Sequence, residues 1–206
     1  MVYRPIIIVA GEPNSIFSEI FLKSIKYKKF KSPIILIASH RLIQKQMKKL
    51  NIFRKIRLVN LLELKKNHLD NKDINLIDVD FSQKKPFDKI SSKSNEYINR
   101  SFDIAIEIIK KKISNKLING PISKKFFLKK KYLGITEYLA HKTKTKNFAM
   151  LIYNKDLSVC PLTTHLPIKQ VSKNINKNMI KKKIVLIDNF FKKYLNRKPH
   201  IAITGL

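Results

Sequence analysis

The stretch Pro5-Ile6-Ile7-Ile8-Val9-Ala10-Gly11-Glu12-Pro13 sets the pattern that the rest of the chain repeats. Its run of β-branched residues predicts a buried strand at 5–10, and the Gly-Glu-Pro that follows predicts a turn into a helix at 15–27. Similar short apolar runs alternate with stretches of helical period along the sequence. This alternation is typical of an α/β layer protein with a largely parallel sheet.

The same criteria place the remaining elements. Strands are expected at 33–38, 57–61, 117–119, 148–153, 158–163 and 200–204. Helices are expected at 40–51, 95–112, 136–144 and 172–194, and in the second of these Ile98, Phe102, Ala105 and Ile109 share one apolar face. The stretch 66–94 is polar and contains Pro86, so we predict an irregular connection there.

Length and composition favour a folded cytoplasmic protein without membrane spans. The chain has 206 residues, of which 44% are hydrophobic, so it can bury a sizeable core. It contains no apolar run long enough to cross a bilayer, and its opening lacks the pattern of a signal peptide. Cys160 is the only cysteine and lies in an apolar run, so we expect a buried, unreactive side chain.

The formal charge of +30 raises the question of a nucleic-acid partner. Only six of the 44 basic residues are Arg, whereas base and phosphate readers favour the planar guanidinium. The lysines also spread along the whole chain, including the helix expected at 172–194. We therefore expect solvated basic faces that attract small anions and no specific nucleic acid, and a basic nucleic-acid-binding protein stays as an alternative.

Turns after the expected strands are the candidate ligand-binding segments. The sequence has neither G-x-G-x-x-G nor a phosphate loop, and its glycines include Gly11, Gly120 and Gly134 in or beside such turns. There the missing side chain allows the backbone to approach a ligand closely. In the first turn, Asn14 or Ser15 is placed to cap the helix that follows.

Three side chains in these segments bear chemistry. Lys124 follows Asn119-Gly120-Pro121-Ile122-Ser123 and can present a cation to a phosphate or a carboxylate. Thr136 can cap a helix or donate its hydroxyl to a ligand. His165 stands at a strand end before Pro167, but a lone histidine is more often structural, and a catalytic metal needs about three protein ligands.

Taken in order, these segments resemble the 4-hydroxythreonine-4-phosphate dehydrogenase family. GEPNSIFSE, NGPISK, GITEYLA and TTHLPI stand where that family carries GDPAGIGPE-like, TGPIxK-like, GHTE-like and TTHLPL-like motifs, and ISSKSNEYI resembles the segment before its long helix. The resemblance covers the whole chain. It implies a three-layer α/β/α fold similar to that of isocitrate and isopropylmalate dehydrogenases, in a protein that has two domains and forms a homodimer.

The resemblance also implies an activity. The family uses NAD and a divalent metal held by three histidines to oxidise 4-phosphooxy-L-threonine to a β-keto acid. This acid decarboxylates to 3-amino-2-oxopropyl phosphate in pyridoxal 5'-phosphate (vitamin B6) synthesis. The metal is Zn, Mg, Mn or Co, because imidazole ligands accept several divalent ions.

Site residues carry over by motif position. His165 matches the first metal ligand, Thr136 matches a substrate-binding residue, and Lys124 lies close to the site as a candidate catalytic residue. Ile135 stands where the family has a substrate-binding histidine, and its side chain cannot form that hydrogen bond. The remaining metal ligands and most of the cofactor segment would follow Leu206, so we expect residues 1–206 to be the N-terminal part of the enzyme and inactive alone.

Two further alternatives stay open at this point. The substitution at Ile135 favours a related dehydrogenase acting on another phosphorylated hydroxy acid, such as a phosphothreonate. The same substitution, together with the missing metal ligands, also fits a relative that has kept the fold and lost catalysis.

Overall fold

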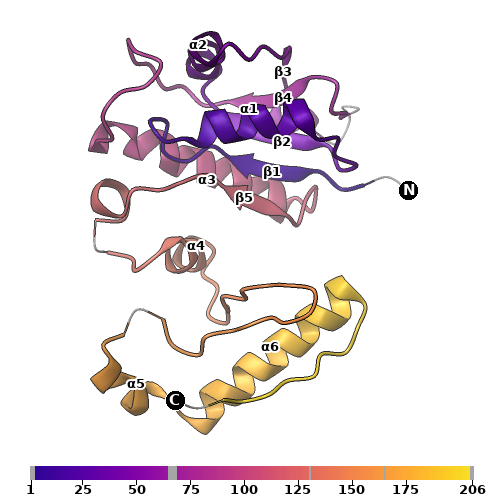
Figure 1. The fold of residues 1–206 in the computed structure, drawn as a ribbon, viewed down its shortest axis with the longest axis vertical. Coiled ribbons are helices and arrows are strands. Elements are labelled where there is room, and N and C mark those ends of the chain that lie inside the picture. Colours follow the sequence, from indigo (N-terminus) through magenta and orange to yellow (C-terminus); the bar gives the residue numbers. More distant parts are fainter. Residues whose placement is uncertain (1–2, 65–68, 130, 165, 205–206) are drawn as a thin grey trace. The chain divides into compact units, whose positions relative to one another are not determined.

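The computed structural model describes residues 3–64, 69–129, 131–164 and 166–204. The chain forms two compact units, Met1–Lys131 and Tyr132–Leu206. Unit 1 contains the sheet, and unit 2 contains mainly helices (Figure 1).

Unit 1 is built on a sheet of five parallel strands in the order β3-β4-β2-β1-β5. The strands are β1 (Ile6–Val9), β2 (Ile34–Ala38), β3 (Ile56–Leu58), β4 (Ile74–Asp78) and β5 (Leu117–Asn119). In the centre of the sheet, Ile8 pairs with Leu36 on one side and with Ile118 on the other. The predicted parallel sheet is therefore confirmed.

Helices cover both faces of this sheet (Figure 1). On one face, α1 (Phe17–Tyr27) and α2 (His40–Leu50) pack Phe21, Leu22 and Met47 against alternate strand residues such as Leu36. On the other, α3 (Asn95–Lys110) packs along β1 and β2 and buries Phe102 and its neighbours. Side chains on successive strand residues point to opposite faces, so both helical layers bury apolar strand residues. The three-layer α/β/α prediction is confirmed.

Strand β4 overturns the prediction that 66–94 is irregular. Ile74, Leu76 and Ile77 are buried, and β4 lies between β2 and β3. The sequence signal is weakened by Asn75, the second residue of the strand, which is 1% exposed. A polar residue at that position breaks the apolar run by which buried parallel strands are usually detected.

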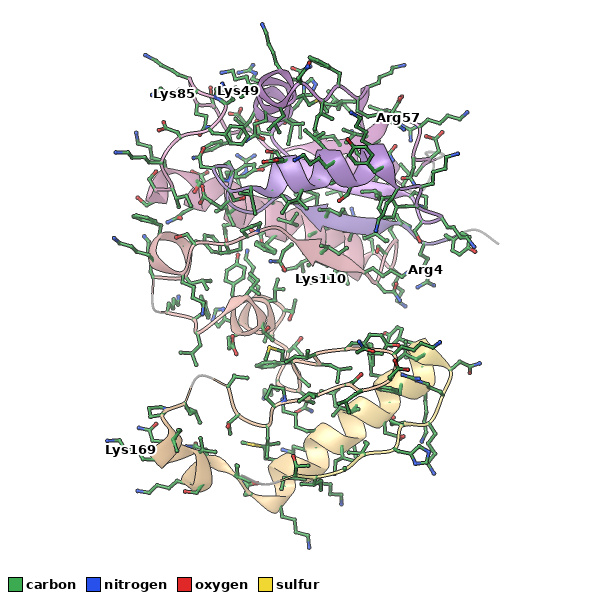
Figure 2. All side chains as sticks on the ribbon, in the orientation of Figure 1. Arg4, Lys49, Arg57, Lys85, Lys110 and Lys169 are labelled. Atoms are coloured by element: carbon green, nitrogen blue, oxygen red, sulfur yellow. The ribbon has the colours of Figure 1, made fainter. Side chains whose placement is uncertain are left out.

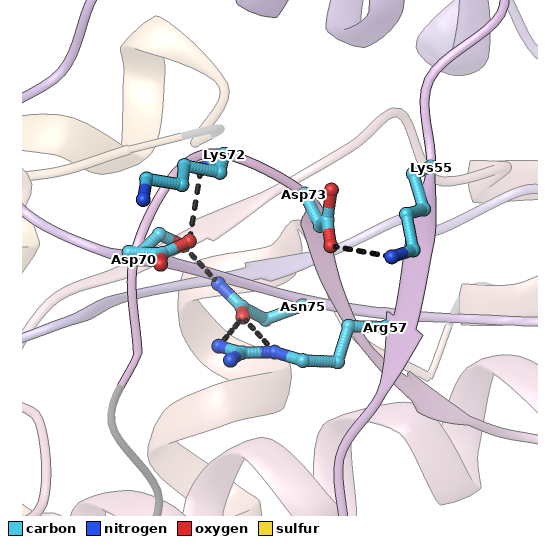
Figure 3. Close-up of polar contacts among 6 residues, drawn as sticks. All are labelled: Lys55, Arg57, Asp70, Lys72, Asp73 and Asn75. Carbon is cyan, nitrogen blue, oxygen red and sulfur yellow. Dashed lines mark hydrogen bonds and ion pairs between the residues drawn. The ribbon is translucent and has the colours of Figure 1, made fainter.

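Asn75 is tolerated because its side-chain amide is fully bonded. Figure 3 shows its bonds with Asp70 and Arg57. Its Nδ2 donates to the backbone oxygens of Ile34, at 2.9 Å, and Asp70, at 2.7 Å. Its Oδ1 accepts from the guanidinium of Arg57 on β3, including a 3.0 Å bond from Nε. One side chain thus links three neighbouring strands, which satisfies the rule that buried polar groups be paired.

Unit 2 contains α4 (Ile135–Lys142), α5 (Ile168–Asn174) and α6 (Lys177–Leu195). The strands predicted at 148–153, 158–163 and 200–204 are wrong. The first two form one antiparallel bridge, Ile152 with Val159, and Ile201 and Ile203 are exposed rather than buried. An apolar run becomes a strand only beside a partner strand, and the described part of unit 2 offers none for longer pairing.

The structure also bears on the predictions for Cys160 and for membrane spans. Cys160 is half-buried rather than buried; its partial burial raises the pKa of the thiol, and the charge of Lys183 opposes that shift. A raised pKa leaves little of the reactive thiolate, in line with an inert side chain. None of the helices in the described ranges combines the length and apolar character that crossing a bilayer requires.

We predict that Asn75→Ala lowers the free energy of unfolding by about 2–4 kcal/mol, because it leaves two backbone oxygens and the Arg57 guanidinium without their buried partner. Urea denaturation followed by circular dichroism measures the change. Asn99→Ala, at an exposed position of α3, is the control and should stay within about 0.5 kcal/mol of the parent. Equal effects of the two substitutions would contradict the role given to Asn75.

Candidate active site

The carboxyl ends of the parallel strands bring several loops of unit 1 to one edge of the sheet. β2 and β4 are neighbours, yet the chain leaves β2 for α2 on one face and leaves β4 for α3 on the other. Ligands of open α/β sheets bind at such a divergence. Here Ser39 Oγ donates to the backbone oxygen of Phe81 at 2.8 Å, and Asp78 Oδ1 accepts from the His40 amide at 2.8 Å.

Two glycines allow the loops after β1 and β5 to cross in contact. Gly120 N donates to the Val9 oxygen, and Glu12 N donates to the Pro121 oxygen, both at 2.8 Å. A Cβ on Gly120 would lie 2.1 Å from the Ala10 oxygen, and one on Gly11, which has φ +73°, would lie 2.5 Å from the Pro121 oxygen. The missing side chains admit a neighbouring backbone, whereas the sequence had suggested close approach to a ligand.

Glu12 is held beneath this crossing as a buried carboxylate. Glu12 is 2% exposed. Ser94 Oγ donates to its Oε2 at 2.8 Å, and the Asn14 amide donates to its Oε1 at 3.3 Å. Burying a carboxylate is unfavourable unless it is hydrogen-bonded, so these donors fix both the carboxylate and the turn that carries it. Ser94 closes the short 3-10 helix before α3, so the bond joins the β1 turn to α3.

A second set of side-chain amides ties the β1 turn to the segment after β4. Asn14 Oδ1 accepts from Gln83 Nε2 and from the Asp88 amide, each at 2.9 Å. From α2, Gln46 Nε2 donates to the Pro13 oxygen at 2.9 Å and the Pro86 oxygen at 3.1 Å. Asn14 therefore does not cap α1; of the two residues expected there, Ser15 accepts from the amide of Phe17, the first residue of α1, at 3.2 Å. The bonds of Asn14 and Gln46 connect the β1 turn, the segment after β4 and α2.

Tyr97 lies under the same edge and is buried. Burial raises the pKa of its phenol above the ordinary value, while hydrogen bonds with the Ser39 backbone and the Ser101 side chain oppose the shift. The negative charges of Asp78 and Glu12 raise the pKa further. The phenol therefore stays neutral at physiological pH and acts as a structural support for the loops.

Lys124 is the one predicted site residue described in unit 1. It begins a short π-helical turn, Lys124–Leu128, and its side chain is exposed. The turn starts through Ser123, whose Oγ accepts from the Phe126 amide at 3.1 Å. The ammonium group is thus available to an anion at the end of the β5 loop.

The other predicted residues belong to unit 2. Ile135 and Thr136 are the first two residues of α4, and both are half-buried. Gly134 occupies the N-cap position, so the capping role considered for Thr136 is wrong and its hydroxyl is not committed to that bond. His165 lies outside the described residues. The structure therefore does not bring the four candidates together within one unit.

The described residues offer no group of three or more His, Cys, Asp or Glu side chains that could hold a metal ion. A catalytic divalent ion ordinarily takes about three protein ligands, and the predicted ligand His165 is not among the residues searched.

Comparison with known protein families decides the relationship. The family model described as "Pyridoxal phosphate biosynthetic protein PdxA" matches residues 29–206. The chain belongs to this family.

Curated PdxA-family relatives match nearly the whole chain. It is 33% identical over 207 aligned residues to 4-hydroxythreonine-4-phosphate dehydrogenase of Sulfurihydrogenibium sp. strain YO3AOP1, covering 97% of this chain and 62% of the relative. It is 31% identical over 206 residues to the Aquifex aeolicus protein of the same name, covering 97% and 61%. The chain thus spans about three fifths of the length of these relatives.

Solved structures agree on the fold. The crystal structure of 4-hydroxythreonine-4-phosphate dehydrogenase from Klebsiella pneumoniae superposes with a TM-score of 0.80 at 22% identity, covering 92% of this chain and 59% of that one. The structure of the Burkholderia phymatum protein of that name superposes with a TM-score of 0.81 at 20% identity, covering 93% of this chain and 59% of that one. These likenesses support the α/β architecture described above.

Sequence reasoning left three residues of the candidate site without a role: Glu12 and Ser94 in the PdxA-family motifs, and Gln83 outside them. Glu12 lies between Gly11 and Pro13 in a predicted turn, where a carboxylate is usually exposed, so the sequence gives no local signal of its burial. Ser94 and Gln83 also carry no local signal, because their partners lie 82 and 69 residues away along the chain.

Gly120→Ala is predicted to destabilise the chain by about 3 kcal/mol, because its Cβ would collide with the backbone of the β1 turn. Thermal or urea unfolding measures the loss. Gly134→Ala is the matched control: its Cβ would come no closer than 3.1 Å to Glu137 Oε2, a flexible carboxylate that can move. The loop-crossing account fails if both substitutions have the same effect.

The buried phenol predicts an alkaline effect. Unfolded tyrosine ionises at about pH 10, whereas the raised pKa of Tyr97 keeps it neutral when folded, so its contribution to stability is present below that pH and declines above it. Tyr97→Phe should have a lower free energy of unfolding than the parent at neutral pH. The difference between the two free energies should shrink by about 1 kcal/mol per pH unit above pH 10.

Urea unfolding at stepped pH values tests this expectation. Tyr27→Phe, at a residue that is 74% exposed, is the control. Its difference from the parent in free energy of unfolding should stay the same across the pH series. A constant difference for Tyr97→Phe as well would show that the phenol does not titrate differently on unfolding.

Proposed function

We propose that the chain is the N-terminal part of an NAD-dependent, divalent-metal-assisted 4-hydroxythreonine-4-phosphate dehydrogenase. The observation that carries the proposal is the PdxA family match over residues 29–206, together with relatives of that name that are 33% and 31% identical. In this role the protein oxidises 4-phosphooxy-L-threonine, and the β-keto product loses carbon dioxide to give 3-amino-2-oxopropyl phosphate, a step toward pyridoxal 5'-phosphate.

Lys124 is proposed to attract and orient the substrate's phosphate or carboxylate. Its ammonium is exposed at the end of the β5 loop, and that loop is held against the β1 turn by the crossing at Gly120. A fixed loop limits the motion of the cation, which favours orientation as well as attraction. The chain's net charge of +30 adds a long-range attraction for a phosphorylated substrate.

Thr136 is proposed to bind the substrate through its hydroxyl. It stands in the first turn of α4, where backbone N–H groups also favour an anion. Ile135 beside it offers only apolar contact, so this position contributes less to substrate binding than a histidine would.

The proposed metal would take His165 as one ligand, with its further ligands outside the described residues. The ion would supply Lewis-acid polarisation of the substrate's hydroxyl, and NAD would supply the hydride acceptor. A homodimer in the cytoplasm completes the proposal.

A second candidate function is oxidation of a different phosphorylated hydroxy acid. D-threonate 4-phosphate dehydrogenase of Pectobacterium atrosepticum is 31% identical over 75 residues, which cover 36% of this chain. Ile135 favours this candidate, because an apolar side chain replaces the family's hydrogen-bonding histidine at the substrate position. The reaction type is unchanged.

Basic side chains lie on many elements of both units. Arg4 precedes β1, Lys49 lies on α2, and Lys110 is the last residue of α3 (Figure 2). Lys169 lies on α5. A dispersed distribution favours general attraction of anions over one nucleic-acid-binding face. Specific nucleic-acid binding is therefore no part of the proposal.

The test is an assay of NADH formation by the complete gene product with 4-phosphooxy-L-threonine and, separately, D-threonate 4-phosphate. We expect NADH with a divalent ion present and loss of that activity in His165→Ala. Thr136→Val should lower kcat/KM by about tenfold through loss of one substrate hydrogen bond. Thr145→Val, at an exposed residue after α4, is the matched control and should leave it unchanged.

The substrate preference separates the two candidates. A higher kcat/KM for 4-phosphooxy-L-threonine supports the first, and a higher value for D-threonate 4-phosphate supports the second. Failure to form NADH from either substrate with Zn, Mg, Mn or Co would refute both.

A further inference from the structure

A pocket of about 480 Å³ opens at the amino edge of the sheet, opposite the edge that carries the candidate active site. Ile34 and Ile74, the first residues of β2 and β4, line it together with Phe21 and Ile25 of α1. Its volume falls in the range of small-molecule sites, about 300–1,000 Å³. Neither the PdxA-family motifs nor the proposed reaction uses this region.

The floor of the pocket is apolar. Phe21, Ile34 and Ile74 are buried residues whose side chains form part of its lining, and Ile25 is half-buried beside them. Phe30 lies on the lining with 37% of its surface exposed. Such a floor favours a ligand with a ring or alkyl body, because covering it removes apolar surface from water.

The polar groups of Asn71 on the wall are already used. Its Oδ1 accepts from the Ile34 amide at 2.9 Å, and its Nδ2 donates to the oxygens of Phe30, at 2.8 Å, and Ser32, at 2.9 Å. Its backbone oxygen accepts from Arg54 Nη2 at 3.0 Å. These bonds hold the wall and one guanidinium in place, which makes the pocket a formed feature of the fold.

The rim is strongly cationic. Five of the lining residues are basic, Lys26, Lys28, Lys29, Arg54 and Lys72, against one acid, Asp73. The Asp73 carboxylate lies 3.9 Å from Lys55 Nζ, so its charge is already shared with a cation that is not on the lining (Figure 3). A concave apolar surface with several positive charges at its rim concentrates anions.

We propose that this pocket binds a small amphipathic anion, with an apolar ring or alkyl body on the isoleucine floor and a phosphate, sulfonate or carboxylate among the rim cations. The body gains from apolar burial, and the head group gains from Arg54 and the lysines. Because the pocket and the candidate active site lie at opposite edges of the sheet, such a ligand would not compete directly with the substrate.

The experiment is a fluorescence titration of the chain with 8-anilinonaphthalene-1-sulfonate, an aromatic sulfonate that brightens in apolar sites, with stoichiometry from calorimetry. One site per chain is expected. Lys28→Glu/Lys29→Glu, which reverses two exposed rim charges, should weaken Kd at least about tenfold. Ile25→Trp, which fills the floor without changing charge, should weaken it about fivefold or more.

The matched control is Lys181→Glu/Lys182→Glu, an adjacent pair of exposed lysines on α6 in unit 2, with the same change in net charge. The Kd of this control variant for the probe should stay within about twofold of the parent's. Circular dichroism confirms that each variant is folded. Inorganic phosphate at the probe's concentration should not displace the probe, because it has no apolar body.

Three results would overturn the proposal. Equal weakening by the rim and control pairs would mean that binding follows net charge alone. Displacement by inorganic phosphate at the probe's concentration would mean a plain anion site. Binding to residues 1–206 that is absent from the complete gene product would mean that another segment covers the pocket. None of these readings depends on dehydrogenase activity, so failure here leaves the proposed function standing.

Discussion

The contact between the backbones at Gly11 and Gly120 is the constraint on which the carboxyl edge of the sheet depends. β1 and β5 are paired neighbours, and the bonds from Gly120 to Val9 and from Glu12 to Pro121 continue their pairing past the strand ends. Any side chain at either glycine would separate the two loops. Because this crossing fixes the loops, it also fixes the buried carboxylate of Glu12 and the start of the turn that carries Lys124.

The two edges of the sheet use the chain's positive charge differently. At the carboxyl edge a buried acid, Glu12, is held by the neutral donors Ser94 and Asn14, and the exposed cation Lys124 stands on a neighbouring loop. At the amino edge the cations surround an apolar floor and outnumber the acid beside them. A rigid polar network suits positioning of a reactive group, whereas an apolar floor with a charged rim suits retention of an amphipathic anion.

The sequence predicted unit 1 well where strands are buried on both faces, because a short uninterrupted run of β-branched residues such as Ile6–Val9 is typical of a strand covered by helices on both sides. It failed at β4, where Asn75 interrupts the run and is stabilised by partners that no local pattern reveals. In unit 2 the runs at 148–153 and 200–204 are also largely apolar, but strand formation depends on a partner strand. Pairing is a property of tertiary structure and cannot be read from one segment.

The family motifs contain two kinds of residue, and the structure accounts for only one of them. Gly11, Gly120 and Ser123 are required by the fold: two admit a crossing backbone, and one caps a helical turn. Lys124 and Thr136 are not, since the first is exposed and the second stands inside α4 after Gly134 has taken the N-cap. Side chains that a fold does not require are the ones most available to a ligand. That division makes Lys124 and Thr136 stronger candidates for substrate contact than the motif glycines beside them.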